Sequence, residues 1–143
     1  MSKEIIDSAL DWVADHIKRY VASNGEDGHD WNGTQILLLT TTGRQSGNLR
    51  RSALIYGRDG DDYVIVASRG GDPNHPAWYM NLVADENVTV QVKGDVFSAV
   101  ASTIDDVSDY ERLWNVMLTH WPAYAEYQEK TSRKIPLVRL RRV

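Results

Sequence analysis

The sequence predicts an α+β fold in which about six mostly antiparallel strands close into a small barrel flanked by helices. Two observations favour this fold. Two pairs of apolar segments are each joined by a short turn that contains Asp and Gly, which is typical of antiparallel hairpins. Helical segments separate these hairpins along the chain. The 143 residues match the length of one ordinary domain, so we expect residues 1–143 to form a single domain.

The first predicted element is an amphipathic helix over residues 4–22, which makes residues 1–22 an N-terminal helical segment. Apolar side chains recur in it at steps of three and four. Residues 1–20 carry four acidic and three basic side chains, whereas anionic lipids attract a basic face. We therefore expect the helix to cover the core, with no strong membrane binding.

The strands follow from short apolar runs bounded by turn residues. Six are predicted, at residues 35–42, 52–57, 62–68, 88–92, 96–103 and 136–143. The segment Arg58-Asp59-Gly60-Asp61 joins the second strand to the third, and Lys93-Gly94-Asp95 joins the fourth to the fifth. In the last strand apolar and basic residues alternate, so they lie on opposite faces.

The remaining helices lie between and after the hairpins. Pro76 suits the first turn of a helix that runs from Ala77 to Ala84. Apolar residues at helical spacing predict a longer helix over residues 106–120, and a short one follows Pro122.

Composition excludes several classes of function. The formal net charge is −4, whereas general nucleic-acid binders usually carry a basic surplus. The chain has no cysteine, so it has no disulfide, thiolate metal site or cysteine nucleophile. The four histidines show no metal-binding spacing, and we expect no metal site. Neither a bilayer-spanning apolar run nor a signal peptide is visible, so the cytoplasm is the expected compartment.

One polar segment has the composition of an anion site. Thr40 to Gly47 reads TTTGRQSG and is followed by Arg50 and Arg51. Glycines let backbone N–H groups approach an anion, and arginine binds phosphate in a bidentate manner. A polar turn with a solvated basic edge explains the same residues equally well. The spacing is not that of a P-loop.

Three further segments combine small, aromatic or amide residues. Ala67-Ser68-Arg69-Gly70-Gly71 ends a strand in two glycines, which suits either close approach to a planar ligand or a flexible turn. In the helix after Pro76, an aromatic stripe is typical of a core, while Asn81 is placed to face a ligand. A third segment repeats an aromatic residue every three positions, which indicates core packing or the mouth of a pocket. Its members are Trp121, Tyr124 and Tyr127.

Taken together, these segments resemble the deazaflavin-dependent nitroreductase family of actinobacteria, whose members are split β-barrel proteins that use coenzyme F-420. The resemblance covers nearly the whole chain from about Tyr20 to Val143. The segments that carry it are NGEDGH at 24–29, LLTTTGRQSG at 38–47, LIYG at 54–57, VIVASRGG at 64–71 and PAWYMNL at 76–82.

The resemblance implies a cofactor site. The phosphate and glutamyl tail would be held by the threonine-glycine-arginine loop, and the deazaflavin ring would lie along backbone groups of the 66–71 segment. The implied cofactor-binding residues are Thr42, Gly43, Arg44, Gln45, Ser46, Gly47, Arg50, Tyr56, Val66, Ala67, Ser68, Arg69, Gly70, Gly71, Trp78 and Asn81. Position 45 is usually basic in this family, so Gln45 implies weaker phosphate binding unless Arg51 compensates.

The resemblance also implies a hydride transfer from the reduced deazaflavin to a quinone, a nitroaromatic compound or a similar electron-poor acceptor. The acceptor would stack on aromatic residues, namely Tyr56, Trp78, Trp121, Tyr124 and Tyr127. Tyr124, Tyr127 or Ser68 would donate a hydrogen bond to the product oxyanion, and these three are the expected catalytic residues.

Two alternatives remain open. An FMN-dependent oxidoreductase of the same barrel class is the rival enzyme, with FMN as its cofactor. A non-catalytic deazaflavin-binding carrier is the rival of another class. Split barrels often pair through their sheets, so a homodimer is a further expectation. A cytoplasmic enzyme that reaches membrane quinones through an interfacial N-terminal helix, at the inner face of the membrane, is the alternative localisation.

Overall fold

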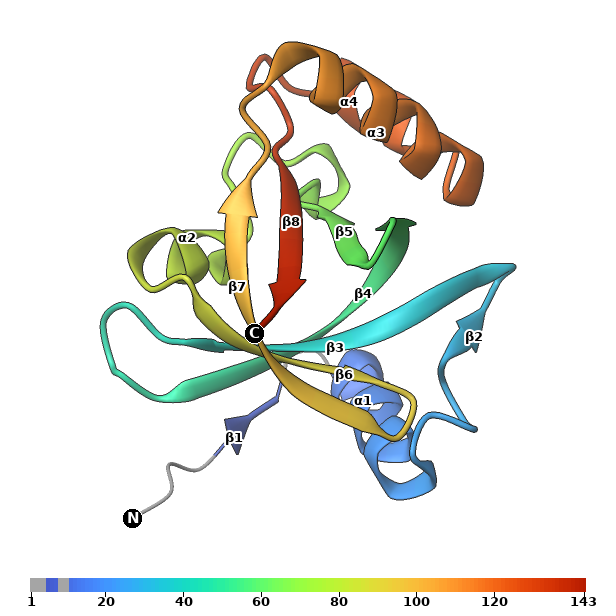
Figure 1. Cartoon of the computed structure of the whole chain (residues 1–143), viewed down its shortest axis with the longest axis vertical. Coiled ribbons are helices and arrows are strands. Elements are labelled where there is room, and N and C mark those ends of the chain that lie inside the picture. Colours follow the sequence, from blue (N-terminus) through green and yellow to red (C-terminus); the bar gives the residue numbers. More distant parts are fainter. Residues whose placement is uncertain (1–4, 8–10) are drawn as a thin grey trace.

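The computed structural model describes residues 5–7 and 11–143, and Figure 1 shows their arrangement. The strands are β1 (Ile5–Ile6), β2 (Asp30–Trp31), β3 (Thr34–Thr42), β4 (Leu49–Asp59), β5 (Asp62–Val66), β6 (Asn87–Val92), β7 (Asp95–Thr103) and β8 (Leu137–Arg142). The helices are α1 (Asp11–Ser23), α2 (Ala77–Ala84), α3 (Val107–His120) and α4 (Tyr124–Glu129), with a short 3₁₀ turn, η1 (Arg69–Gly71).

Six antiparallel strands form a closed barrel, which confirms the predicted α+β split barrel. They follow one another in the order β4, β5, β8, β7, β6 and β3, and the pairing of β3 with β4 closes the ring. The closing pair runs from Ile36 opposite Ile55 to Thr42 opposite Leu49. Both predicted hairpins are present, because β4 pairs with β5 and β6 pairs with β7.

The N-terminal segment departs from the prediction. Ile5 and Ile6 form a strand that pairs in parallel with Leu49 and Arg50 of β4, so the expected helix over residues 4–22 is wrong at these two positions. Residues 4 and 8–10 of that prediction lie outside the described residues, and α1 begins at Asp11. Strand pairing occupies backbone groups at the start of β4 that an adjacent helix would leave free.

The alternation of side chains along β3 divides the apolar residues between two cores. Leu37 and Leu39 face the barrel interior, whereas Ile36 and Leu38 face outward and pack against Ile17 of α1. The buried Tyr20 of α1 donates a hydrogen bond to the Ile36 carbonyl at 3.0 Å. The described part of the N-terminal helix therefore covers a core, as expected.

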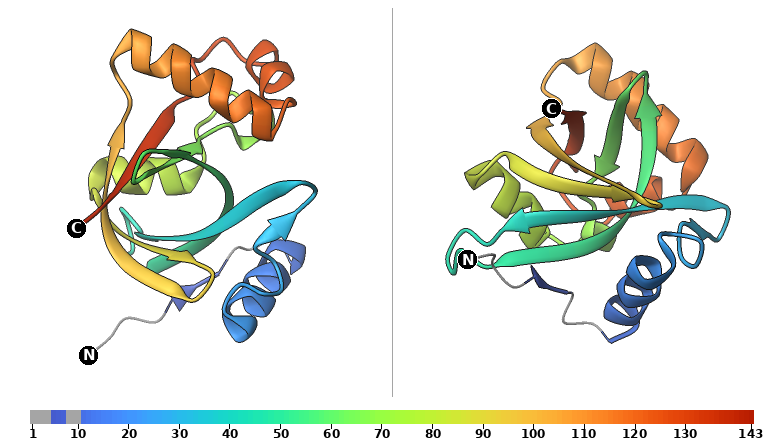
Figure 2. Two further views of the ribbon diagram at one scale, coloured as in Figure 1. Left: turned by 45° about the vertical axis from the view of Figure 1, so that its right-hand side comes forward. Right: turned by 60° about the horizontal axis from the view of Figure 1, so that its bottom comes forward.

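Helices α3 and α4 cover a third core on another side of the barrel, where Leu113 and Met117 pack against β5 and β8. Figure 1 and the left view of Figure 2 show these helices above the barrel strands and α1 below them, and Ile55 of β4 packs against both cores. Within residues 5–7 and 11–143, no helix combines the length and the apolar character needed to cross a bilayer.

Candidate functional site

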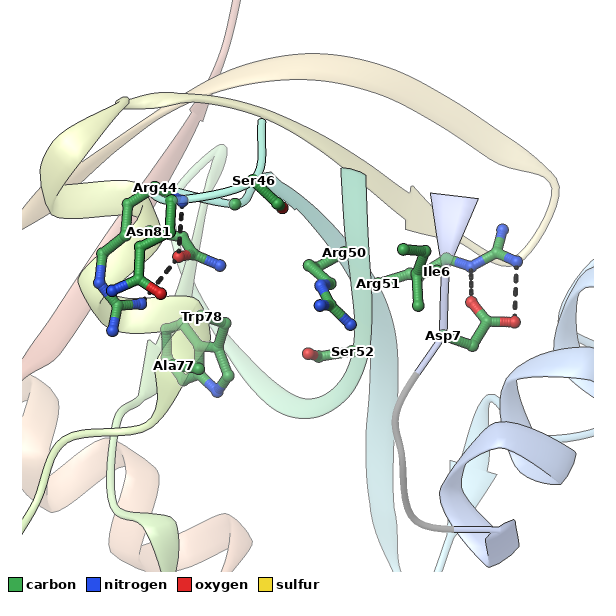
Figure 3. A pocket seen from close by; sticks show the side chains of 12 residues that line it. Ile6, Asp7, Arg44, Ser46, Arg50, Arg51, Ser52, Ala77, Trp78 and Asn81 are labelled. Carbon is green, nitrogen blue, oxygen red and sulfur yellow. Dashed lines mark hydrogen bonds and ion pairs between the residues drawn. The ribbon is translucent and has the colours of Figure 1, made fainter. Parts of the chain in front are cut away.

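A cavity of about 490 Å³ lies where the loop after β3 meets the start of β4 and α2. It is called the arginine cavity below, and Figure 3 shows it. It is lined by Ile6, Asp7, Gly43, Arg44, Gln45, Ser46, Arg50, Arg51, Ser52, Ala77, Trp78 and Asn81. Of the residues expected at the cofactor phosphate, the structure brings Gly43 to Ser46, Arg50 and Asn81 together here. Thr42 and Gly47 do not line the cavity.

Asn81 fixes the loop that forms one wall of the arginine cavity. Its side chain is only 4% exposed. Its Oδ1 accepts hydrogen bonds from the backbone N–H of Arg44 at 3.2 Å and from Nη1 of Arg44 at 3.0 Å. Its Nδ2 donates to Oγ1 of Thr41 at 3.3 Å. The Asn81 amide thus binds the loop on both sides of Thr42 and directs the Arg44 side chain.

The three arginines of the cavity differ in their partners. Arg51 donates from Nε to Oδ1 of Asp7 at 2.7 Å and from Nη2 to Oδ2 at 3.2 Å. Figure 3 shows Arg50 between this ion pair and the Arg44–Asn81 group. Within the described ranges, Arg50 is exposed and has no carboxylate partner. The sequence analysis expected Arg51 to bind the phosphate in place of a basic residue at position 45. The Asp7 carboxylate competes with a phosphate for this guanidinium.

A second cavity, of about 540 Å³, adjoins the first, because Trp78 lines both. It is called the aromatic cavity below. Its lining comes from α1, β2, β3, β4, the end of β5, η1, the start of α2 and the α3–α4 region. The lining residues are Trp12, Val13, His16, Trp31, Ile36, Ala53, Leu54, Ile55, Val66, Ser68, Arg69, Gly70, Pro76, Trp78, Trp121, Tyr124 and Tyr127.

Eight residues expected at the ring or acceptor meet in this cavity, namely Val66, Ser68, Arg69, Gly70, Trp78, Trp121, Tyr124 and Tyr127. Ala67 and Gly71 do not line it. Ala67 is fully buried. A Cβ added at Gly71 would lie 2.6 Å from the Tyr127 carbonyl oxygen. Gly71 therefore allows close packing of η1 against α4, which is not the ligand contact that was expected.

Tyr56 lines neither cavity, which corrects its expected place in the cofactor and acceptor sites. Its side chain is 5% exposed and packs inside the barrel. Its hydroxyl lies 2.8 Å from Nε2 of His29. The alternation of side chains in β4 explains this position, because Ile55 packs outside the barrel while Tyr56 points to the interior.

The aromatic residues of the cavity contact one another in defined geometries. Trp121 stacks on Trp31 of β2 with ring centroids 5.5 Å apart. Nε1 of Trp121 donates to the Tyr127 hydroxyl oxygen at 3.3 Å, which leaves the Tyr127 hydroxyl hydrogen free to donate elsewhere. Tyr124 meets Tyr127 edge-on at 6.1 Å. Burial raises the pKa of Tyr124, and the neighbouring Tyr127 adds to the effect, so Tyr124 stays a neutral phenol.

Arg133 holds the wall that carries Ser68, and the sequence analysis did not identify it. Its Nη2 donates to the Ser68 carbonyl at 2.7 Å, its Nη1 to the Ala67 carbonyl at 3.2 Å, and its Nε to the Asp72 carbonyl at 2.9 Å. Nη1 also lies 3.1 Å from Nδ1 of His75. Burial, followed by the charge of Arg133, lowers the pKa of His75. A single basic residue in a polar loop gives no sequence signal for this role.

The sequence analysis also missed the wall built by Trp12, Val13 and His16 of α1 and by Trp31 of β2. Three of these residues lie in the predicted N-terminal helix, to which no part of the site was assigned, and only the packing of α1 and β2 places this wall beside α4. Among the described residues, no group of three or more His, Asp or Glu side chains is placed to hold a metal ion.

The donors of the two cavities fit a ligand with an anionic tail and a planar head. Arginine, hydroxyl and backbone N–H groups of the arginine cavity suit phosphate or carboxylate oxygens. The flat side chains of the aromatic cavity suit stacking on an extended ring system. Because Trp78 belongs to both linings, the two kinds of donor lie next to each other.

Comparison with known proteins identifies relatives of this chain. Residues 12–141 match the family described as F420H(2)-dependent quinone reductase. An F420H(2)-dependent quinone reductase of Mycobacterium tuberculosis is 42% identical over 130 residues, which cover 89% of this chain and 87% of that protein.

Two solved structures are also similar. An F420-H2-dependent reductase is 40% identical with a TM-score of 0.67, and the match covers 73% of this chain and 92% of that chain. A protein described as a domain-swapped dimer is 36% identical with a TM-score of 0.71, and the match covers 93% of this chain and 99% of that chain.

Proposed function

This chain belongs to the F420H(2)-dependent quinone reductase family, and we propose that its two cavities hold the two ends of coenzyme F-420. It is an oxidoreductase that uses the reduced form of this coenzyme, and its acceptor is a quinone or a similar electron-poor compound. One observation supports the assignment of the two ends of the coenzyme to the two cavities. Trp78 lines both the cavity rich in arginine and the cavity rich in aromatic side chains.

In the arginine cavity, Arg44 and Arg50 bind the phosphate of the tail, with Ser46 and Gln45 as further donors. Asn81 acts through Arg44, because its amide oxygen accepts from both the backbone and the guanidinium of that residue. Arg50 is the freest of the three guanidinium groups, since Asp7 holds Arg51 and Asn81 holds Arg44.

In the aromatic cavity, Val66, Ser68 and Gly70 border the deazaflavin ring, and Trp78 closes the end nearest to the tail. When bound, the reduced deazaflavin supplies a hydride. Trp121 and Tyr127 stack against the acceptor and exclude water from it. Tyr124, Tyr127 and Ser68 donate hydrogen bonds to the oxygen on which negative charge develops.

The proposed acceptor and the proposed oligomeric state both come from the descriptions of similar proteins. The family description names quinones, and nitroaromatic acceptors remain a prediction. A homodimer is proposed because a 36% identical protein is described as a domain-swapped dimer. The absence of strong membrane binding also remains a prediction, as does the alternative of a peripheral location at the inner face of the membrane.

Tryptophan fluorescence tests the cofactor assignment, because Trp78 lines both cavities. We expect oxidised F-420 to quench the fluorescence at lower concentration than FMN does. Arg50→Met should weaken F-420 binding at least about tenfold, because a hydrogen bond from a charged group contributes about 1.5–3 kcal/mol. The same variant should bind the deazaflavin riboside that lacks phosphate as tightly as the wild type does.

Arg142→Met serves as the matched control, since Arg142 pairs with Asp95 at 2.8 Å and lines neither cavity. Tighter binding of FMN than of F-420 would favour the rival flavin enzyme. An unchanged F-420 affinity in Arg50→Met would contradict the tail assignment.

A further inference from the structure

His16 is the histidine of α1 that lines the aromatic cavity. Its Nε2 lies 2.8 Å from the carbonyl oxygen of Gly28. A carbonyl oxygen only accepts hydrogen bonds, so Nε2 must carry a hydrogen. The nitrogen that remains able to exchange a proton is therefore Nδ1.

The loop around Gly28 is shaped to hold this ring. Gly28 has a φ of +117°, a conformation that other residues rarely adopt, and a Cβ added there would lie 3.0 Å from Nε2 of His16 and 3.3 Å from Cδ2 of Tyr20. Glycine thus permits both the backbone conformation and the close approach of the imidazole.

The proposed reaction needs a proton that the hydride does not bring. Addition of a hydride to a quinone leaves a hydroquinone oxyanion, which must be protonated to give the neutral product. The ionisable groups that line the aromatic cavity with His16 are Arg69, Tyr124 and Tyr127. Arginine keeps its proton in proteins, and burial raises the pKa of Tyr124. Arginine and phenol side chains ordinarily keep their protons near neutral pH, so Arg69, Tyr124 and Tyr127 donate hydrogen bonds here without releasing a proton.

Histidine is the side chain that ordinarily gains and loses a proton near neutral pH. Within the described residues, His16 is the one histidine among those that line the aromatic cavity. It also lies on a different element from Tyr124 and Tyr127, which belong to α4; Figure 1 shows α1 below the barrel strands and α4 above them. The two helices thus approach the cavity from different directions.

We propose that His16 is the proton donor of the quinone reduction, an inference that rests on the proposed function. The Nδ1–H bond of the imidazolium breaks, its electron pair stays on Nδ1, and a new O–H bond forms on the hydroquinone oxyanion. The ring then has its hydrogen on Nε2, so its bond to Gly28 persists in both protonation states. A proton from solvent returns the ring to the imidazolium.

Charged and titratable groups lie on the same helix as this histidine, on the loop after that helix and across the aromatic cavity. On α1, Asp15 pairs with Arg19 at 3.0 Å, and Arg19 also pairs with Asp27 of the following loop at 3.2 Å. Tyr20 lies beside Gly28 and donates its hydroxyl to a backbone carbonyl. On the cavity side, Arg69 lies 3.7 Å from Asp72. The turnover rate should fall as the pH rises, because the imidazolium form is the proton donor.

The test is the variant His16→Gln, whose side-chain amide retains an N–H for the Gly28 carbonyl but releases no proton. We expect kcat with a quinone to fall about 100-fold, at the lower end of the range for general acid catalysis. The KM for the quinone and the affinity for F-420 should change little, and the fall in rate with rising pH should disappear. His120→Gln is the matched control, since His120 ends α3 and lines neither cavity.

A second measurement does not depend on turnover. In the wild-type chain without cofactor, the ¹⁵N shifts of His16 should show the Nε2–H tautomer at high pH. The added probe is 1-naphthol, an analogue of the hydroquinone product, and no oxidation takes place because the cofactor is absent. Its binding should shift the Nδ1 resonance of His16. His16→Gln with wild-type kcat and pH profile, or an unresponsive Nδ1, would overturn the role of His16 and leave the proposed function intact. A wild-type chain that does not bind F-420 would overturn both.

Discussion

At the scale of single residues, Trp78 and Asn81 of α2 link the arginine cavity to the aromatic cavity. They lie three positions apart on α2, so they project from neighbouring positions of the same helix. Asn81 binds Arg44 in the arginine cavity, while Trp78 forms part of both linings. The orientation of this short helix therefore sets the position of the anionic tail relative to the stacking surface.

The tyrosines of α4 give a prediction at the same scale. Tyr124→Phe and Tyr127→Phe, tested singly, each remove one hydroxyl from the aromatic cavity, and Tyr127→Phe also removes the acceptor of the Trp121 N–H. We expect each change to lower kcat for a quinone by about twofold to tenfold, because the loss of a neutral hydrogen bond costs about 0.5–1.5 kcal/mol. Cofactor affinity, measured by fluorescence, should be retained. Unchanged turnover in both variants would rule out the roles of these phenols.

At the scale of elements, Arg133 joins three segments that have no local reason to lie together. It lies in the loop before β8, binds the carbonyls at the end of β5, and contacts His75 just before α2. Ser68 and Pro76, which belong to two of these segments, both line the aromatic cavity. One guanidinium thus positions two walls of the cavity relative to each other.

Replacing Arg133 should therefore affect stability and the cavity together. Arg133→Met leaves the Ala67 and Asp72 carbonyls without this donor, and we expect a loss of about 2 kcal/mol or more in the free energy of unfolding, measured by urea titration. Arg133→Lys should recover only part of this loss, because an ammonium does not reproduce the planar fork of a guanidinium. Arg142→Met, which removes an exposed ion pair, should cost no more than about 1 kcal/mol. Equal losses in Arg133→Met and Arg142→Met would contradict this account.

At the scale of the whole molecule, a cluster around Asp59 ties the C-terminal elements to the barrel. Asp59 ends β4, and its carboxylate accepts from Arg112 of α3 at 3.0 Å and from Arg139 of β8 at 3.0 Å. The Arg112 hydrogen bond, with a further contribution from Arg139, holds the pKa of Asp59 below its usual range. The side chain is only 25% exposed, so solvent screens these contacts incompletely.

This depressed pKa predicts how the stability of the chain depends on pH. The stabilisation by Asp59 is complete above the pKa of an unfolded aspartate, about 3.9, and is lost as the pH falls through the lower pKa of the folded state. Asp59→Asn should therefore be less stable than the wild type at pH 7, and the difference should shrink at about pH 3. Urea titrations at both pH values measure this difference in stability, and a difference that does not depend on pH would contradict the assignment.

One cooperative transition is expected if residues 1–143 form a single domain.

The hairpins, most helix positions and the order of the site segments could be predicted from the amino-acid sequence alone. These features depend on neighbours in the chain: alternating side chains and Asp-Gly turns define β4 and β5, and a proline followed by helix-forming residues defines α2. Sequence patterns alone also predict candidate site segments at 43–46, 66–70, 78–81 and 121–127. Local pattern is sufficient for such features because each is stabilised within a few residues.

Which side chains of these segments meet depends on the tertiary fold. Tyr56 and Ile55 are neighbours in sequence, yet the closure of the barrel sends one to the interior and the other to the outer core. Arg51 meets Asp7, Arg133 meets Ser68, and His16 meets Gly28 across separations from 12 to 65 residues. Such pairs form because packing brings distant backbones within hydrogen-bond reach. The periodicity of side chains within one segment carries no information about which residue of a distant segment will become a hydrogen-bond or ion-pair partner.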